Sequence, residues 1–453
     1  MKRRRQRLTQ PNTTVRPSSG LPWVFTDKAI TAWGGLRLMQ EFLTRLHFRE
    51  MLATSALPQP LSNRGYSPVV MVESFLVAVW VGGVHFAHTA LVRFDAALCE
   101  IFGWSQVASV ATFTRFFRRF RQSTNQAVSA QWAHWVWQQV APTTLTLDLD
   151  SSVLTRYGTQ EGAARGYNPQ KKGRPSHHPL FAFVADLRMV LHAWLRPGNT
   201  ADSSGLTTFF DEAVAPLTTR HRIGLIRADA GFCANGILAH FEARSLSYIV
   251  AGRLFPGLRL LLPGLTAWTA VDRGLAVTEI LYHAQGWPQA RRILVVRQEE
   301  AERPQAQGKL LKDVPGYRYQ LFVTNLMLPP VEVWRLYRQR ADSENRIAEL
   351  KHDFGLTGFC LNAFWGTEAA FSTVVLAYNL MSLFRQALLR APTAVKLSTM
   401  RAQCFALGAW IGRQGRHKVL RISVPPIRRP WFEGLFARLE GFHPPWPTTV
   451  STV

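Results

Sequence analysis

The stretch Trp334–Phe354 reads WRLYRQRADSENRIAELKHDF. Side chains that carry functional chemistry recur along it at offsets of three, four and seven, and they are Tyr337, Arg340, Glu344 and Lys351. Since an α-helix turns about 100° per residue, these offsets place all four side chains within an arc of roughly 60°. Pro330 suits the first turn of a helix and Gly355 suits a left-handed stop. The sequence therefore predicts one helix with an acid, two bases and a phenol on a single stripe.

Two apolar segments upstream carry further acids. Residues Leu145–Leu154 read LTLDLDSSVL and predict a buried strand, on which Asp148 and Asp150 point to the same face because they lie two positions apart. Residues Arg222–Ala228 predict a second strand that runs directly into Asp229, with a glycine two positions later. An acid at the end of an apolar strand is well placed to act as a rigidly held ligand, and a turn or a helix cap is the alternative role for it.

The spacing Tyr-x(2)-Arg-x(3)-Glu-x(6)-Lys resembles the signature of a superfamily of bacterial insertion-sequence transposases with a DDE (Asp, Asp, Glu) active site. The resemblance implies an α/β fold with an RNase H-like mixed sheet and helices, an inserted antiparallel β subdomain, and helical N- and C-terminal regions. It also implies that Asp150, Asp229 and Glu344 are the catalytic acids. The resemblance covers roughly residues 143–360, and the flanks match only weakly.

Two of these assignments are choices between neighbouring acids. In the family, small hydroxyl residues follow the first acid, and two serines follow Asp150. Asp150 is therefore preferred, while Asp148 stays open as the first ligand or as a supporting acid. On the predicted helix, Asp342 and Glu349 are rotated well over about 100° from the stripe, which favours Glu344.

Acids of this kind suit metal-dependent phosphodiester chemistry. In-line displacement needs an activated attacking oxygen and a stabilised leaving oxygen, and two divalent ions about 3.5–4 Å apart can provide both. Oxygen-only ligands suit Mg²⁺, and Mn²⁺ can substitute. The resemblance makes Asp150, Asp229 and Glu344 the metal ligands, and no protein nucleophile is required. Tyr337 as the covalent nucleophile of a tyrosine recombinase is disfavoured, because it shares a helix face with an acid.

Basic side chains are predicted to bind the DNA. The resemblance assigns Tyr337, Arg340 and Lys351 to holding the transposon end, where an arginine forks onto a phosphate and a lysine supplies a point charge. Arg338 and Arg346 are predicted to face away, as surface or secondary DNA contacts. Other candidates lie in the loop after the first strand and on a phenylalanine-rich helix within residues 108–121, and they are Lys171, Lys172, Arg174, Arg115, Arg118 and Arg119. The three arginines on the phenylalanine-rich helix make that helix the candidate for recognising transposon ends.

The overall charge agrees with a nucleic-acid partner. Lys and Arg number 53 against 29 acids, which gives a formal net charge of +24 and a field that attracts polyanions. A membrane surface is disfavoured, because no secretory signal is recognised and the apolar run Val69–Phe86 contains Glu73, which favours a buried helix. The four cysteines show neither disulfide nor zinc spacing. We expect a cytoplasmic, nucleoid-associated bacterial protein that acts on double-stranded DNA, as a homodimer when two ends are held together.

The predicted organisation has six parts. They are a basic arm (1–20), a helical DNA-binding domain (21–142), the first part of the catalytic domain (143–254), a β insertion (255–318), the second part of the catalytic domain (319–390) and a basic C-terminal region (391–453). Asp186 is expected in a hairpin turn and Asp202 as a helix cap. The predicted function is transposition, by metal-dependent cleavage at element ends and transfer of the 3′-hydroxyl into target DNA. A structure-specific nuclease and an inactive transposase-derived DNA-binding protein are the alternatives.

Overall fold

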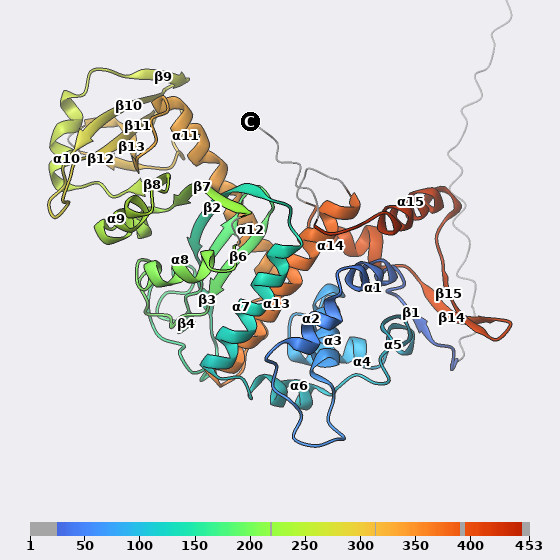
Figure 1. Cartoon of the computed structure of the whole chain (residues 1–453). Helices are drawn as coiled ribbons and strands as arrows, with labels where there is room; N and C mark the ends of the chain where they lie inside the picture. Colours follow the sequence, from blue (N-terminus) through green and yellow to red (C-terminus); the bar gives the residue numbers. More distant parts are fainter. Residues whose placement is uncertain (1–24, 218–219, 313, 390–394, 446–453) are drawn as a thin grey trace, which may run out of the picture.

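The fold is a mixed α/β arrangement around one large sheet, as the sequence predicts (Figure 1). The computed structural model describes residues 25–217, 220–312, 314–389 and 395–445. The predicted basic arm at residues 1–20 therefore lies outside the described residues. Within the described ranges, no helix combines the length and the apolar character needed to cross a bilayer.

Five strands form the part of the sheet that carries the first two predicted acids. They are β2 (Thr143–Ser151), β5 (Leu180–Val184), β6 (Met189–Trp194), β7 (His221–Ala228) and β8 (Tyr248–Gly252). Their order is β6-β5-β2-β7-β8, with β5 antiparallel to both β2 and β6, and with β7 parallel to both β2 and β8. This is an RNase H-like order, and both strands predicted to carry acids are confirmed. Leu145, Leu147 and Leu149 are fully buried on one face of β2, so the alternate residues Asp148 and Asp150 share the other face.

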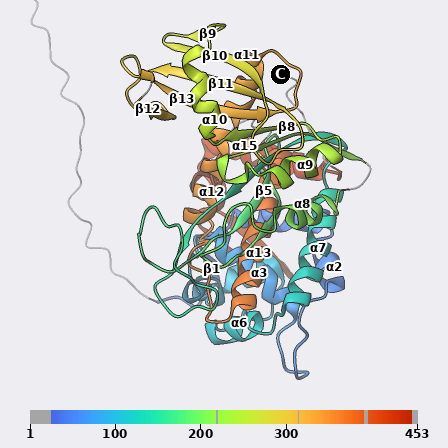
Figure 2. The ribbon, with the colours of Figure 1, turned by 90° about the vertical axis from the view of Figure 1, so that its left-hand side faces the viewer.

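The predicted antiparallel insertion extends this sheet. Its strands are β9 (Thr269–Asp272), β10 (Leu275–Tyr282), β11 (Arg291–Glu299), β12 (Lys309–Leu311) and β13 (Val314–Thr324). Strand β13 pairs antiparallel with β11 on one side and with β8 on the other, so backbone hydrogen bonds run without interruption from the core into the insertion. These strands and α10 (Pro256–Leu261) lie at one end of the molecule, and α9 (Asn235–Ala243) lies beside the start of this part (Figures 1 and 2).

Two long helices, α7 (Gln122–Gln138) and α13 (Phe364–Phe384), run side by side and pack on the sheet near β6 (Figure 1). Helix α13 continues into a π-helical turn at Arg385–Leu389. The Asn379 side chain of α13 accepts from the backbone N–H of Val190 and donates to its C=O, both at 2.8 Å. A helix side chain thus satisfies the outer edge of β6 where that strand begins. Helix α8 (Leu206–Val214) also contacts β6.

The N-terminal region is mainly helical, as predicted. Its helices are α1 (Leu36–Arg45), α2 (Phe48–Thr54), α3 (Pro68–Trp80), α4 (Ala90–Arg93), α5 (Ala96–Phe102) and α6 (Val110–Phe117). Residues Met71–Trp80 of α3 are all buried, which agrees with the buried helix predicted from the apolar run. The C-terminal region contains α14 (Leu397–Met400), α15 (Arg429–Glu440) and a hairpin of β14 (Ala409–Gln414) and β15 (His417–Ile422), and β14 pairs with β1 (Ile30–Thr31). The sequence did not predict this hairpin.

Candidate active site

The single continuous helix predicted over residues 334–354 is wrong in one respect. Helix α11 (Pro330–Arg338) and helix α12 (Asp342–His352) are joined by a 3₁₀ turn at Gln339–Ala341. Because a 3₁₀ turn winds about 120° per residue instead of about 100°, three residues displace the helical stripe by roughly 60°. Pro330 at the first turn and a left-handed Gly355, with φ +67°, are confirmed.

The extra rotation changes which side chains of α12 are buried. Those facing the protein interior are Ser343, Arg346, Ile347, Glu349 and Leu350. Arg346 is only 2% exposed, so the prediction that it is a surface or secondary DNA contact is wrong. Glu344 lies on the exposed side of α12. Arg338 is exposed, as predicted, and stacks over Trp334.

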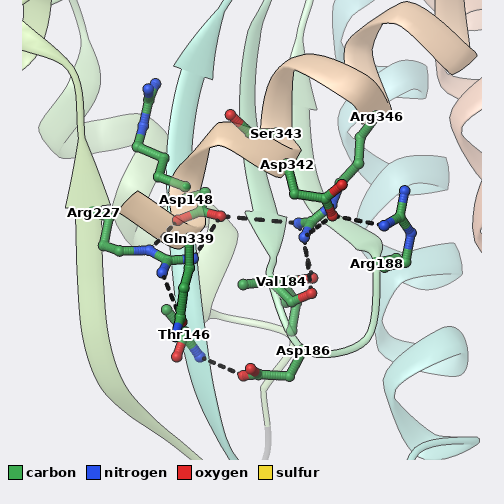
Figure 3. A network of polar contacts seen from close by, with 12 residues as sticks. Thr146, Asp148, Val184, Asp186, Arg188, Arg227, Gln339, Asp342, Ser343 and Arg346 are labelled. Atoms are coloured by element: carbon green, nitrogen blue, oxygen red, sulfur yellow. Dashed lines mark hydrogen bonds and ion pairs between the residues drawn. The ribbon is translucent and has the colours of Figure 1, made fainter. Parts of the chain in front are cut away.

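Asp148 is the central acid of a buried ion-pair network (Figure 3). Its side chain is completely buried, and Arg227 of the neighbouring strand β7 donates to both oxygens, at 2.6 and 3.0 Å. The Arg346 guanidinium lies 4.0 Å from the same carboxylate. Since two buried cations already neutralise Asp148, it acts as a structural acid between strand and helix.

The same network attaches the helices to the sheet (Figure 3). Arg227 also donates to the backbone C=O of Leu336 in α11, at 2.6 Å. Arg346 donates to the C=O of Ala185, at 2.9 Å, and to Asp342, which also pairs with Arg188 at 2.7 Å. Asp342 is therefore engaged in structural ion pairs and is not free to act as a ligand.

Glu349 and Asp186 also take part in contacts within the scaffold. Glu349 pairs with Arg385 at 2.6 Å and also accepts from the N–H of Leu397. Like Asp342, Glu349 is held in contacts with other parts of the protein. Asp186 lies in the turn between β5 and β6 and accepts from the N–H of Thr146, so its predicted position in a hairpin turn is confirmed.

Asp150 has a different environment from Asp148, although it lies only two residues further along β2. One of its oxygens accepts from the Ser343 hydroxyl at 2.8 Å and lies 3.1 Å from Nη2 of Arg340. The other accepts from the N–H of Ser151. Arg340 is located on the 3₁₀ turn and is itself 8% exposed. Among the described residues, the ion pair of Asp150 is thus with one cation, Arg340.

Asp229 follows the last residue of β7, beside the end of β2. The parallel register pairs Leu149 with Ala228, which places Asp150 and Asp229 at adjacent ends of two neighbouring strands. Burial raises the pKa of Asp229, the Arg340 charge opposes this, and the negative charge of Asp150 raises the pKa further. Asp229 also accepts from the N–H of Gly231, as in the turn role considered from the sequence. The two acids therefore interact electrostatically and share one guanidinium.

Tyr337 lies in the electrostatic field of both acids, and Lys351 lies in that of Asp150. Burial raises the pKa of the Tyr337 phenol to about 12, with a smaller contribution from the charges of Asp229 and Asp150. Burial lowers the pKa of Lys351, and the charge of Asp150 opposes that shift. Both basic positions of the predicted stripe, together with its phenol, therefore lie in the electrostatic field of the acids.

Glu344 lies at the rim of this group. It lines a cavity of about 320 Å³ together with Tyr337 and Arg340. No hydrogen bond or ion pair to Glu344 occurs within the described part of the chain. In the same ranges, no three His, Cys, Asp or Glu side chains lie close enough together to hold one metal ion. The structure therefore brings Asp150 and Asp229 together, and leaves Glu344 apart from them.

A further acid, Asp202, adjoins the site. It accepts from the Ser151 hydroxyl at 2.6 Å and lies 3.2 Å from Nε2 of His178. A Cβ at Gly231 would come within 2.4 Å of the Asp202 carboxylate, so this approach requires glycine. The prediction that Asp202 caps a helix is wrong, because the N-cap residue of α8 is Gly205. Only tertiary contacts reveal this position of Asp202, and no local sequence pattern indicates it.

The remaining predicted DNA-binding side chains lie elsewhere on the molecule. The loop between β3 (Leu154–Thr155) and β4 (Ser176–His177) exposes Lys171, Lys172 and Arg174. Ser109 caps α6, and the phenylalanines of that segment are buried. Arg115 and Arg118 are exposed and Arg119 is partly buried, with the latter two just beyond the end of α6.

The chain is similar to known proteins both in sequence family and in solved structure. A family model described as "Transposase DDE domain group 1" matches residues 19–443. One similar solved structure is described as "Cryo-EM structure of piggyBac transposase synaptic complex with hairpin DNA (SNHP)", with a TM-score of 0.46 and 13% sequence identity. The match covers 82% of this chain and 79% of that chain. No curated protein matches the sequence.

Proposed function

We propose a function from one premise, which is that the chain belongs to the transposase DDE domain group 1 family. It is accordingly an enzyme that acts on DNA. The proposed reaction is cleavage of double-stranded DNA at the ends of a bacterial insertion sequence, followed by attack of the freed 3′-hydroxyl on target DNA. The Tyr337, Arg340, Glu344 and Lys351 spacing supports the assignment to the insertion-sequence branch.

One observation carries the proposal. Asp150 and Asp229 lie at adjacent ends of two parallel strands and share Arg340, whereas Asp148 is neutralised by its own arginines. The charge of Asp148 is neutralised by two arginines, whereas the charge of Asp150 is only partly neutralised. A carboxylate of the second kind is the better candidate for a functional role. We therefore assign Asp150, and not Asp148, as the first catalytic acid.

The donor set fits a divalent cation. Its ligands are carboxylate oxygens, which Mg²⁺ and Mn²⁺ prefer. Burial raises the pKa of Asp229, and the charge of Asp150 adds to this rise, so a bound cation would stabilise the ionised form. Asp150 and Asp229 would hold the metal, and Glu344 would complete the set by approaching from its exposed position. Divalent metal held there would supply activation of the attacking oxygen and stabilisation of the leaving oxygen.

The basic side chains would position the DNA. The buried Nε of Arg340 has no hydrogen-bond partner among the described residues, while Nη2 donates to the C=O of Leu149 and faces Asp150. Arg340 also lines the cavity beside Tyr337 and Glu344, and we assign its guanidinium to a DNA phosphate, because an arginine can bind a phosphate through a forked pair of hydrogen bonds. Lys351 would add a point charge, and Tyr337 would contact the transposon end from the same side.

The outer basic surfaces would supply the sequence-independent part of the affinity. The exposed loop with Lys171, Lys172 and Arg174 and the end of α6 with Arg115, Arg118 and Arg119 are the proposed peripheral contacts. Two transposon ends would be held together by a homodimer, and the working location would be the bacterial nucleoid.

Cleavage of a labelled DNA fragment that contains the terminal inverted repeat beside the gene tests the proposal. With Mg²⁺ present, the wild-type chain should cut the end and join it to a target plasmid. Asp150→Asn and Asp229→Asn should bind the fragment and fail to cut it, while Asp186→Asn, a matched change in an exposed turn, should cut normally. Cutting without joined product would favour the nuclease alternative, and an uncut fragment with wild-type protein would favour the inactive DNA-binding protein.

A further inference from the structure

A second cavity, of about 980 Å³, is lined by residues of α7, β6, α8 and α13. Its lining shares no residue with the cavity at Tyr337, Arg340 and Glu344. A volume of this size is typical of small-molecule sites, which bind their ligands through apolar walls and a few convergent polar groups. The mechanism proposed above does not use this cavity.

The charge of its lining is opposite to that of the chain. The protein carries a formal net charge of +24, yet the cavity is lined by Glu161, Glu212 and Glu368 and by no lysine or arginine. The possible cations in the lining are His134 and His192. Such a lining repels the phosphates of DNA, so the occupant must differ from the main substrate.

Neutral donors hold two of these carboxylates in place. Glu368 accepts from the Asn125 side chain at 2.8 Å and from the N–H of Leu195. Burial, together with the negative charge of Glu212, raises the pKa of Glu368 to about 7. Glu161 accepts from the N–H of Phe364 at the start of α13.

The third carboxylate is held among aromatic rings. Glu212 accepts from the Trp194 indole at 2.9 Å and lies 3.3 Å from His192. The rings of Phe364 and Trp365 meet edge to face, with centroids 5.0 Å apart, on another wall of the cavity. Aromatic faces bind ammonium groups and also cover the methylene chain that joins them.

We propose that this cavity binds a linear polyamine. Its three acids come from three separate segments, since Glu161 lies between β3 and β4, Glu212 lies on α8 and Glu368 lies on α13, so the negative charge is distributed over several walls of the cavity. Separated carboxylates suit a cation whose ammonium groups are separated by methylenes, and the aromatic walls suit those methylenes. A polyamine also accompanies DNA in the cell by its charge, so the enzyme meets it together with its substrate.

Calorimetric titration of the full chain with spermidine, in the absence of DNA, tests the proposal. Wild-type protein should show saturable binding at one site per chain. Glu368→Gln and Glu212→Gln should each weaken binding about tenfold or more, as expected for the loss of a charge-assisted hydrogen bond. Trp365→Leu should weaken it about threefold or more.

Glu440→Gln is the matched control, because it makes the same change of charge at the exposed end of α15. It should bind spermidine as the wild type does. Glutamine keeps the acceptor for Asn125, and a melting curve of each variant checks that it is folded. Absence of saturable binding, equal affinity in all four variants, or saturable binding of a Lys/Arg-rich peptide without binding of spermidine would each overturn the proposal.

Discussion

Asp148 and Asp150 provide the sharpest test of how this site is built. Both lie on one face of β2, yet we expect Asp148→Asn to damage the fold and Asp150→Asn to damage only catalysis. Without the Asp148 charge, Arg227 and Arg346, which are 1% and 2% exposed, keep buried charges that have lost their central partner. Removing one partner of such a buried pair costs about 3–5 kcal/mol.

Asp150→Asn removes a charge with mixed effects. The ion pair with Arg340 is lost, but so is the repulsion that raises the pKa of Asp229. These two effects oppose each other, and we expect a net change in the free energy of unfolding within about 1 kcal/mol.

Urea unfolding followed by tryptophan fluorescence gives both values, provided that the slope of free energy against urea is unchanged. The same preparations are then tested for end cleavage. An Asp150→Asn protein destabilised as much as Asp148→Asn would refute the division into structural and reactive acids. So would an Asp148→Asn protein that loses less than about 1 kcal/mol.

Three further results are expected. Arg346→Ala should lower the free energy of unfolding by about 3–5 kcal/mol, and Arg338→Ala, which removes an exposed arginine from the preceding helix, should change it by less than about 0.5 kcal/mol; thermal melting measures both. Arg340→Ala should slow single-turnover cleavage of a pre-bound end about tenfold or more, and Arg340→Lys should not restore the rate, because lysine lacks the forked donors. The pKa of Glu368 rises from 4.5 to about 7 on folding, so the folded state binds the proton more tightly than the unfolded state. As the pH rises from 4.5 to 7, the wild type should therefore lose about 1–2 kcal/mol of stability relative to Glu368→Gln. Urea unfolding at each pH measures this difference, and a difference that stays constant with pH would contradict the burial of an uncompensated acid.

The positions of the acids on the strands could be predicted, because they follow from the local pattern of apolar residues. An apolar strand of alternating leucines fixes the face of Asp148 and Asp150, and the end of the next apolar strand fixes Asp229. Local pattern could not decide between the two acids of β2, because their difference arises from Arg227 and Arg340, which approach from distant parts of the chain.

The predicted stripe of side chains is wrong where the winding of the helix departs from the ideal. Three residues of 3₁₀ geometry between α11 and α12 displace every later side chain by roughly 60°, and sequence periodicity does not report such a turn. That displacement buries Arg346 against the sheet and leaves Glu344 exposed. Tyr337 and Arg340 were correctly grouped, because they lie before the displacement is complete.

The buried network supports the proposed catalytic pair, Asp150 and Asp229. Arg227 fixes Asp148 on β2 and the backbone of Leu336 in α11, while Arg346 fixes α12 to the loop after β5. Arg340 lies on the turn between these two anchored helices, so its distance from Asp150 is set by contacts on either side of it. A carboxylate with incomplete charge compensation can persist at a strand end only if its neighbours cannot relax toward it. The fully paired Asp148 provides that rigidity, which explains why a structural acid lies two residues before the acid that we propose to be catalytic.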